Sequence, residues 1–462
     1  MRSALILRAA LATSVLALIP ATTAGLAAVD ARSGPQFSRL NTVYQLVKAQ
    51  YVEKVDDDKL INGAIEGMLA ALDPHSSYLE GNSLERLNTM IDGGYAGLGL
   101  SVGMDQDTVK VISPLRGSPA AEAGVKAGDY ITHLDGKLIY GVPLDDAVAQ
   151  MRGEAGTKIR LTIFRPGRDE PFDVTVTRKE IKLEPVTWKL DGTIGVLTVN
   201  EFSKDVGNYV RDGIADLRKQ SGGKLGGLIL DLRSNPGGSL EEAVALSDLF
   251  LSSGDIVSQR GRITGEDMYF RADDMRNYPD LPPAVAATFK GDTAKGLPLV
   301  VLIDEGSASA SEIVAGALQD QHRALIMGQR SFGKGSVQSL FYLDPRHERA
   351  VKLTTARYYT PSGRSVQEGG IEPDVRVPQL SDPDARRRSQ MALRESDLRR
   401  HLVNEAAIDD KQLEGDTQDD PRFKLSADEL KAKKIDDFQL YYAVQTLRRT
   451  GPGVTALAAR KK

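Results

Sequence analysis

The chain has no cysteine among its 462 residues. This absence excludes disulfide bonds, thiolate metal sites, a cysteine nucleophile and the acylated cysteine of a lipoprotein. Histidine is also scarce, and none of the five copies has a metal-ligand spacing such as His-x-x-x-His. These are His75, His133, His322, His347 and His401. We therefore expect no catalytic metal, and the sequence indicates no cofactor.

The charge has no dominant sign, because 59 basic residues stand against 63 acidic ones for a net charge of -4. This balance gives no electrostatic reason to expect nucleic acid as a partner. Beyond the N-terminus no segment has 18 uninterrupted apolar residues, so we expect the remainder to be soluble. A chain of this length predicts two or three domains.

The N-terminus has the pattern of a secretory signal peptide. Arg2 and Arg8 precede an uncharged stretch over 9–29, and small residues between Ala24 and Ala28 suit cleavage. The stretch is also long enough for an uncleaved membrane anchor, which stays open as the alternative. We expect residues 1–28 to be removed and the mature protein to be periplasmic or secreted.

A serine-rich segment, residues 306–312, lies between an apolar strand candidate at 299–303 and a helical pattern at 313–318. A serine at such a strand-to-helix turn projects from a rigid scaffold. The free N–H groups and positive end of the helix favour a developing negative charge there. The alternative is structural, since Ser309 and Glu312 also fit a helix capping box.

A second segment, residues 331–338, follows another apolar strand candidate at 323–327 and places Lys334 between Gly333 and Gly335. A lysine acts as a general base only when neutral, which requires its pKa to fall from about 10.4 toward ~7 to 8. Burial between apolar strands and glycines favours that change. Gln338 lies on the same side of an extended chain and is placed to orient the lysine amine.

Together these two segments resemble the carboxy-terminal processing peptidases, and the resemblance extends from about residue 37 to 378. It implies an α/β fold with a crotonase/ClpP-like protease core, an inserted β-rich PDZ domain and helical N- and C-terminal regions. It also implies that Ser309 is the nucleophile, Lys334 the general base and Gln338 its support. Asp320 falls where some family members carry an acidic residue important for activity.

Residues 95–178 alternate short strands and helices. The loop Gly97-Leu98-Gly99-Leu100 is no dinucleotide fingerprint, because Val102 stands where the third glycine belongs and a strand follows. The loop resembles the carboxylate-binding loop of PDZ domains, whose N–H groups bind a C-terminal carboxylate while an edge strand pairs with the peptide. Val148 is predicted to line the groove. We expect substrates with free apolar C-termini.

Short apolar strands at 194–199, 227–232 and 299–303 alternate with helices at 206–220 and 240–251. This alternation predicts a largely parallel sheet covered on both faces. The turn over 231–238 is by itself only a tight turn before a helix. The resemblance assigns to it an oxyanion-hole N–H, from Gly237 or Gly238, with the N–H of Ala310 as the second donor.

The predicted domains are a signal peptide (1–28), an N-terminal helical region (36–93), a PDZ domain (94–180), the peptidase core (181–379) and a charged C-terminal region (380–462). The last begins as a solvated, flexible or loosely helical segment and ends in an amphipathic helix near 438–447. We predict a homo-oligomer formed through the terminal helices. An adaptor or activator protein is a further possible partner.

The sequence leaves three rivals to a serine endopeptidase that cleaves C-terminal regions of exported or unfolded proteins. Residues 328–334 fit the P-loop glycines and lysine, but Gly335 stands where that motif needs Ser or Thr. A Ser-His-Asp triad with His322 places the histidine ~20 Å along the helix from Ser309. The third is a PDZ scaffold without catalysis, or a protease that is inactive until a partner binds.

Overall fold

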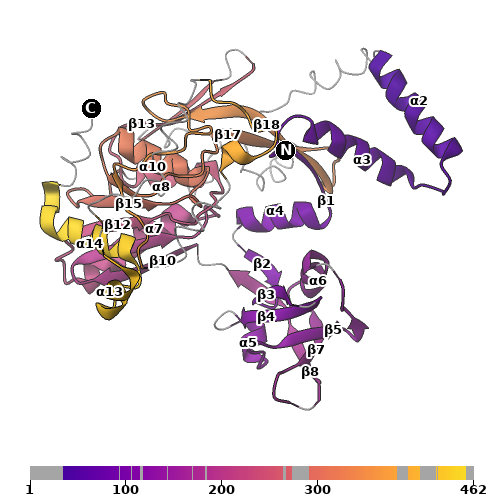
Figure 1. Cartoon of the computed structure of the whole chain (residues 1–462), viewed down its shortest axis with the longest axis horizontal. Helices are drawn as coiled ribbons and strands as arrows, with labels where there is room; N and C mark the ends of the chain where they lie inside the picture. The colour runs from indigo at the N-terminus through magenta and orange to yellow at the C-terminus, as the bar shows by residue number, and fades with distance from the viewer. Residues whose placement is uncertain are drawn as a thin grey trace, which may run out of the picture. The chain divides into compact units, whose positions relative to one another are not determined.

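The computed structural model describes residues 35–92, 94–105, 107–114, 118–142, 144–168, 170–182, 185–263, 267–272, 291–381, 394–405, 423 and 425–453. The chain divides into two compact units, each treated by itself below (Figure 1). Residues 85–184 form one unit, and the chain before and after them forms the other. The predicted signal peptide lies outside the described residues. Within the ranges given, no helix is long and apolar enough to cross a bilayer.

The larger unit is built on a six-stranded sheet in the order β10-β11-β12-β15-β16-β19. Its strands are β10 (Val186–Asp191), β11 (Ile194–Val199), β12 (Gly227–Asp231), β15 (Leu299–Ile303), β16 (Leu325–Gly328) and β19 (Val375–Arg376). From β11 to β19 every neighbour is parallel, and only β10 runs antiparallel to β11. The largely parallel sheet expected from the sequence is confirmed.

Helices cover both faces of this sheet. One face packs against α7 (Val206–Gln220), α8 (Leu240–Asp248) and α10 (Ala310–Asp320). The other packs against α13 (Ala427–Ala432) and α14 (Phe438–Thr450). Successive residues of β15 alternate between the two clusters, as the period of a strand requires. Helix α14 thus buries within its own chain the apolar face that the sequence analysis offered to a partner.

A second sheet of five antiparallel strands adjoins the parallel one in the same unit and was not foreseen. Its order is β1-β18-β13-β14, with β17 also paired to β18. The strands are β1 (Ser77–Glu80), β13 (Gly254–Gly261), β14 (Met268–Ala272), β17 (Ser336–Tyr342) and β18 (Arg349–Tyr359). β18 therefore joins the N-terminal region, through β1, to the strand that follows Lys334.

The N-terminal region forms α2 (Pro35–Gln50), α3 (Asp57–Ala70) and α4 (Asn82–Asp92). Its first two helices and the bend between them leave large apolar side chains exposed, among them Phe37, Leu46, Val52 and Met68. Strand β1 and the turn before it connect α2 and α3 to the antiparallel sheet of the larger unit.

The smaller unit contains a sheet in the order β3-β4-β5-β7-β8, with β6 paired to β5. Its elements are β2 (Gly94–Gly97), β3 (Leu100–Asp105), β4 (Thr108–Pro114), α5 (Pro119–Glu122), β5 (Tyr130–Leu134), β6 (Lys137–Leu138), α6 (Leu144–Met151), β7 (Lys158–Phe164), β8 (Phe172–Thr177) and β9 (Lys179–Lys182). β2, the first strand of the unit, pairs antiparallel with β9, its last strand. Strand β3 lies at one edge of the sheet.

The charged segment after residue 380 differs in part from the expectation of a solvated surface. Residues 382–393 and 406–422 lie outside the described residues. Between them, the short helix η3 (Glu395–Asp397) packs on the larger unit, and the side chain of Glu395 has no exposed surface. Burial is possible because His75 and Gln367 donate hydrogen bonds to this carboxylate.

Candidate active site

Ser309 lies at the turn between β15 and α10 and is the N-cap residue of that helix. Its backbone has φ 54° and ψ −111°, a conformation rarely adopted by residues other than glycine and typical of functional sites. The N–H of Ser309 donates to the Glu312 carboxylate at 2.8 Å, but the hydroxyl makes no capping hydrogen bond. The capping box is therefore only half formed, and the serine hydroxyl remains available for chemistry.

The neighbouring serines hold the turn together. The hydroxyl of Ser307 donates to the carbonyl of Leu232 at 2.8 Å, and that of Ser311 to the carbonyl of Asn235 at 2.9 Å. Both acceptors belong to the turn after β12. These two bonds fix the position of the nucleophile turn against the predicted oxyanion turn, and they leave Ser309 as the reactive candidate among the three serines.

The two glycines of the predicted oxyanion turn differ in their hydrogen bonds. The amide of Gly237 donates to Oδ1 of the buried Asn235 at 2.9 Å, while Nδ2 of Asn235 donates to the Val199 carbonyl. The amides of Gly238 and Ala310 are not donors in any hydrogen bond between described residues. Of the two glycines, Gly238 thus keeps the available N–H.

Gly237 lies directly against Ser309. A Cβ atom at this position would stand 2.9 Å from Cβ of Ser309 and 2.7 Å from the carbonyl oxygen of Ala308. Its φ of 100° is also one that side chains rarely permit. Only glycine allows the two turns to approach this closely.

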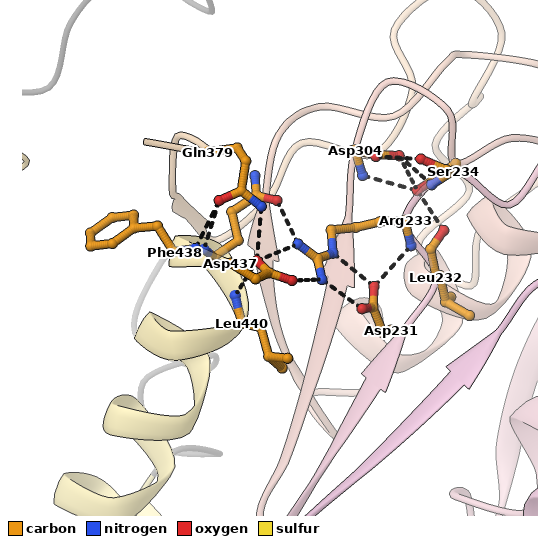
Figure 2. A network of polar contacts seen from close by, with 11 residues as sticks. Asp231, Leu232, Arg233, Ser234, Asp304, Gln379, Asp437, Phe438 and Leu440 are labelled. Atoms are coloured by element: carbon orange, nitrogen blue, oxygen red, sulfur yellow. Dashed lines mark hydrogen bonds and ion pairs between the residues drawn. The ribbon is translucent and has the colours of Figure 1, made fainter. Parts of the chain in front are cut away.

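Figure 2 shows an ion-pair network that fixes the start of the oxyanion turn. The Arg233 guanidinium bridges Asp231 and Asp437, each at 2.7 Å. Although burial acts in the opposite direction, the hydrogen bonds and charge of Arg233 lower the pKa of Asp437 to about 2. On the other side, Asp304 accepts the N–H of Ser234 at 2.7 Å. The N-terminus of α14 therefore supports a turn about two hundred residues earlier in the chain.

Lys334 lies in the loop between β16 and β17. Part of its side chain is accessible, yet burial, and next the charge of Lys352, lower the pKa of Lys334 to about 8. The loop itself is held by Gln367, whose Oε1 accepts the N–H of Gly335 at 3.0 Å. A base role requires a change of this direction and size.

Glu312 connects the serine turn to the lysine loop. Its carboxylate has no exposed surface and accepts hydrogen bonds from the N–H groups of Ser309, Gly333 and Lys334 and from the Ser331 hydroxyl, at 2.6 to 3.0 Å. Burial raises the pKa of Glu312 to about 7 despite these donors. The sequence analysis considered Glu312 only as a capping partner. An acidic residue in the first turn of an otherwise apolar helix was the available signal.

Gln338 lies in β17, next to a register shift between Val337 and Gln338. Its Nε2 donates to the Ser336 hydroxyl at 3.0 Å and to the Thr354 hydroxyl at 3.3 Å. Across the described ranges, no hydrogen bond joins the Lys334 amine to Ser309 or to Gln338. The structure also contains no group of three or more potential metal ligands within those ranges.

Comparison with known proteins gives three family matches and a set of close relatives. Peptidase family S41 matches residues 193–377, the PDZ domain matches 87–164, and the N-terminal domain of the activating protease CtpB matches 21–83. A carboxy-terminal-processing protease of Bartonella bacilliformis is 44% identical over 375 residues, covering 81% of this chain and 82% of that protein. This chain belongs to the S41 carboxy-terminal processing proteases.

Two further proteins are similar to this S41 protease. The carboxy-terminal processing protease CtpA of Bacillus subtilis is 35% identical over 344 residues, covering 74% of this chain and 69% of that one. A solved photosystem II D1 C-terminal processing protease is 27% identical with a TM-score of 0.43, covering 79% of this chain and 93% of the other. The predicted serine peptidase activity and the S41 fold with an inserted PDZ domain are confirmed.

In this S41 protease Tyr358, from β18, contacts both halves of the site. Its buried hydroxyl donates to the Lys334 carbonyl, and the phenol lies close enough to Ser309 for the serine side chain to act on its pKa. Burial raises the pKa of Tyr358 well above its ordinary value, so the phenol stays neutral. The sequence predicts a strand over 349–361 beside the lysine that lines the substrate cleft, but nothing in it aligns Tyr358 with Ser309.

Asp320 lies at the opposite end of α10 from Ser309, eleven residues or ~16 Å along the helix axis. Its Oδ2 accepts the N–H of Ser362 at 2.9 Å, so it stabilises the turn after β18. His322 lies beyond it, at the same distant end. The protease thus has no hydrogen-bonded contact between Ser309 and this histidine, and β17 follows Lys334 where a P-loop would have a helix.

The predicted peptide-binding residues of the PDZ domain surround the start of the edge strand. Leu98 and Gly97 are buried, and the Leu98 carbonyl accepts the N–H of Ala120 at 3.0 Å. Gly99 has φ 69°, and a Cβ there would stand 2.3 Å from Cβ of Ser118. Leu100 begins β3, while Val148 is half-buried on α6.

Proposed function

We propose that Ser309 attacks the scissile carbonyl carbon of a polypeptide while Lys334, as the neutral amine, accepts its proton. The C–O bond that forms gives a tetrahedral oxyanion, which the N–H groups of Gly238 and Ala310 stabilise. Lys334 then returns the proton to the leaving amine as the peptide C–N bond breaks, and water hydrolyses the acyl-enzyme. The observation that carries the proposal is the partly buried lysine with a lowered pKa, connected through Glu312 to the serine turn.

The site must close before it reacts, because no hydrogen bond among the described residues joins the Lys334 amine to Ser309, which lies beside Tyr358. We infer that bound substrate, or an activator protein, brings the amine to Ser309, with Gln338 holding it. This step keeps open the alternative of a protease that stays inactive until its partner binds.

The PDZ domain is proposed to capture free apolar C-termini of exported or unfolded proteins. Support comes from the edge position of β3 and the glycine loop before it, which suit addition of a peptide strand with its carboxylate at the loop. Deletion of residues 95–178 should reduce the selectivity of cleavage. Equally selective, unchanged cleavage after the deletion would contradict a gating or capturing role.

We further propose that the chain is exported to the periplasm or secreted, with its signal peptide removed. We propose that a second copy of the chain packs against the apolar side chains that are exposed on α2 and α3. The C-terminal helix is not part of this surface, since α14 packs on its own sheet.

The decisive experiment uses the purified mature chain and an unfolded protein that ends in an apolar residue. The parent should cleave it, while Ser309→Ala and Lys334→Ala should bind without cutting. If the parent is silent, candidate activators are added next. Cleavage by either variant at the parental rate would overturn the assignment of the dyad.

A further inference from the structure

The turn before β1 packs against the strands that surround the lysine. β1 pairs with β18, with Ser77 opposite Lys352. This pairing places Asp73 beside the hairpin that β17 and β18 form, and only 4% of the surface of Asp73 is exposed. Its carboxylate accepts the Ser76 hydroxyl at 2.7 Å and the Thr354 hydroxyl at 3.1 Å. The N-terminal region thus contributes a buried carboxylate to the peptidase unit.

The bond from Thr354 to Asp73 helps to orient the Gln338 amide, whose Nε2 also donates to the Ser336 hydroxyl at 3.0 Å. A hydroxyl has one hydrogen, and a carboxylate only accepts, so Thr354 donates to Asp73 and accepts from its other neighbour. That neighbour is Nε2 of Gln338, at 3.3 Å. Because the amide nitrogen is held on this side, Oε1 of Gln338 remains the acceptor for the hydrogens of an amine.

A second carboxylate acts in the same way on the lysine loop. Glu395 accepts Nε2 of His75 at 2.8 Å and Nε2 of Gln367 at 3.0 Å. With its nitrogen held by Glu395, Gln367 presents Oε1 to the N–H of Gly335, the residue after Lys334. Two segments more than three hundred residues apart, joined by the pair of His75 and Glu395, therefore converge on this loop.

We propose that Asp73, His75 and Glu395 are positioning residues of the peptidase, which orient Gln338 through Thr354 and hold the Lys334 loop through Gln367. The inference rests on the proposed function, since it assigns these groups a role in aligning the base. It gives the N-terminal turn a direct part in catalysis, separate from any part in assembly.

The charges around Lys334 determine in which direction each substitution should move the pKa of Lys334, and this direction can be measured. Burial first, and then the charge of Lys352, lower the pKa of Lys334, while the charges of Glu395, Glu312 and Asp73 raise it. Although burial opposes it, the bonds from His75 and Gln367 hold the pKa of Glu395 below its ordinary value, so this carboxyl is ionised at neutral pH. Two other titratable groups lie against the loop: Tyr358, which is neutral, and Glu368, whose N–H donates to the Gly333 carbonyl and whose carboxylate pairs with His401 at 2.7 Å.

The first test replaces the relay hydroxyl. Thr354→Val should lower kcat by roughly tenfold, through misorientation of Gln338, with KM unchanged. Thr354→Ser should restore the rate. The matched control is Thr355→Val on the opposite face of β18, which should leave kcat unchanged because its hydroxyl is hydrogen-bonded to Ser339 and not to Asp73 or Gln338. Equal rates for Thr354→Val and Thr355→Val would overturn the relay.

The second test measures kcat/KM against pH. Glu395→Gln removes a charge that raises the pKa of Lys334, so the acid limb should move to lower pH. Lys352→Met removes a charge that lowers it, so the limb should move to higher pH. His347→Gln, at the far end of the same hairpin, should leave the limb in place. Limbs that do not move in either variant, while Lys334→Ala remains inactive, would overturn the positioning role alone. Full activity of Lys334→Ala would instead overturn the proposed function.

Discussion

The two halves of the active site are built in different ways. The serine half is local, since β15, the turn and α10 are consecutive, and Ser307 and Ser311 anchor the turn to backbone carbonyls. The lysine half is assembled from distant segments, with side chains from the N-terminal turn, α10, β18 and η3 around one loop. The proposed nucleophile is therefore held by local contacts, whereas the position and pKa of the proposed base depend on long-range contacts.

The difference has a functional consequence. Changes in the serine half should reduce the rate without moving its pH dependence, because they alter geometry around a hydroxyl that does not titrate in this range. Changes in the lysine half should also move the pH dependence, because the base is surrounded by four charged groups. Glu312 belongs to both halves, because its carboxylate accepts N–H groups from the serine turn and from the lysine loop.

The largest effect is expected for Glu312→Gln. A glutamine has one acceptor oxygen for the donors that converge on Glu312, and its NH2 group would face N–H groups in a buried site. We expect kcat to fall roughly a hundredfold or more, and the free energy of unfolding to fall by about 1–3 kcal/mol. Steady-state kinetics and urea unfolding measure the two. The control is Glu305→Gln, on the same turn, because the Glu305 side chain is bonded to Gln329. Parental kcat in Glu312→Gln would contradict the role of Glu312 in connecting the serine turn to the lysine loop.

A smaller effect, confined to the serine half, is expected for Gly237→Ala. The new methyl group would displace Ser309 or the Ala308 carbonyl, and kcat should fall roughly tenfold with the acid limb unmoved. Gly222→Ala is the matched control, because it also has a positive φ but nothing within 4 Å of the added Cβ. Both variants carry backbone strain, so only a difference in kcat between them reports the contact with Ser309. A shift in the acid limb of the pH–rate profile of Gly237→Ala would contradict the proposed division between the two halves.

The smallest effect is expected for Asp320→Asn. The amide oxygen still accepts the N–H of Ser362, and the ion pair with Arg364, at 3.6 Å, is partly exposed. Such a pair contributes about 0–1 kcal/mol. We expect kcat within about twofold of the parent by the same assay. A loss of tenfold or more would assign Asp320 a role that its distance from Ser309 does not explain.

The sequence predicted the parallel sheet well because its strands are continuous apolar runs that alternate with helices. It also indicated Ser309 and Lys334, since their glycine-rich and serine-rich surroundings are contiguous motifs. The antiparallel sheet was missed, because β1 and β18 carry no pattern that reports their pairing across the 268 residues between them. Glu395 was expected to be solvated for a similar reason, as its partners His75 and Gln367 are distant in sequence.

Contacts that depend on tertiary packing could not be predicted from the sequence. Tyr358 reaches Ser309 only because β18 lies beside the lysine loop, and Asp437 reaches Arg233 only because α14 covers the parallel sheet. The choice between the two oxyanion glycines likewise needed the bond from Gly237 to Asn235. In each case the deciding partner lies on an element whose placement no local pattern determines.

The most direct test of the central claim measures how fast Ser309 reacts with a fluorophosphonate probe as pH varies, because this reports activation of the nucleophile without a known substrate. The account predicts a rate that falls below the pKa of Lys334, half-maximal near pH 8, with labelling lost in both Ser309→Ala and Lys334→Ala. A rate that stays flat from pH ~5 to 9 with chemistry limiting, or parental labelling of Lys334→Ala, would contradict Lys334 as the base.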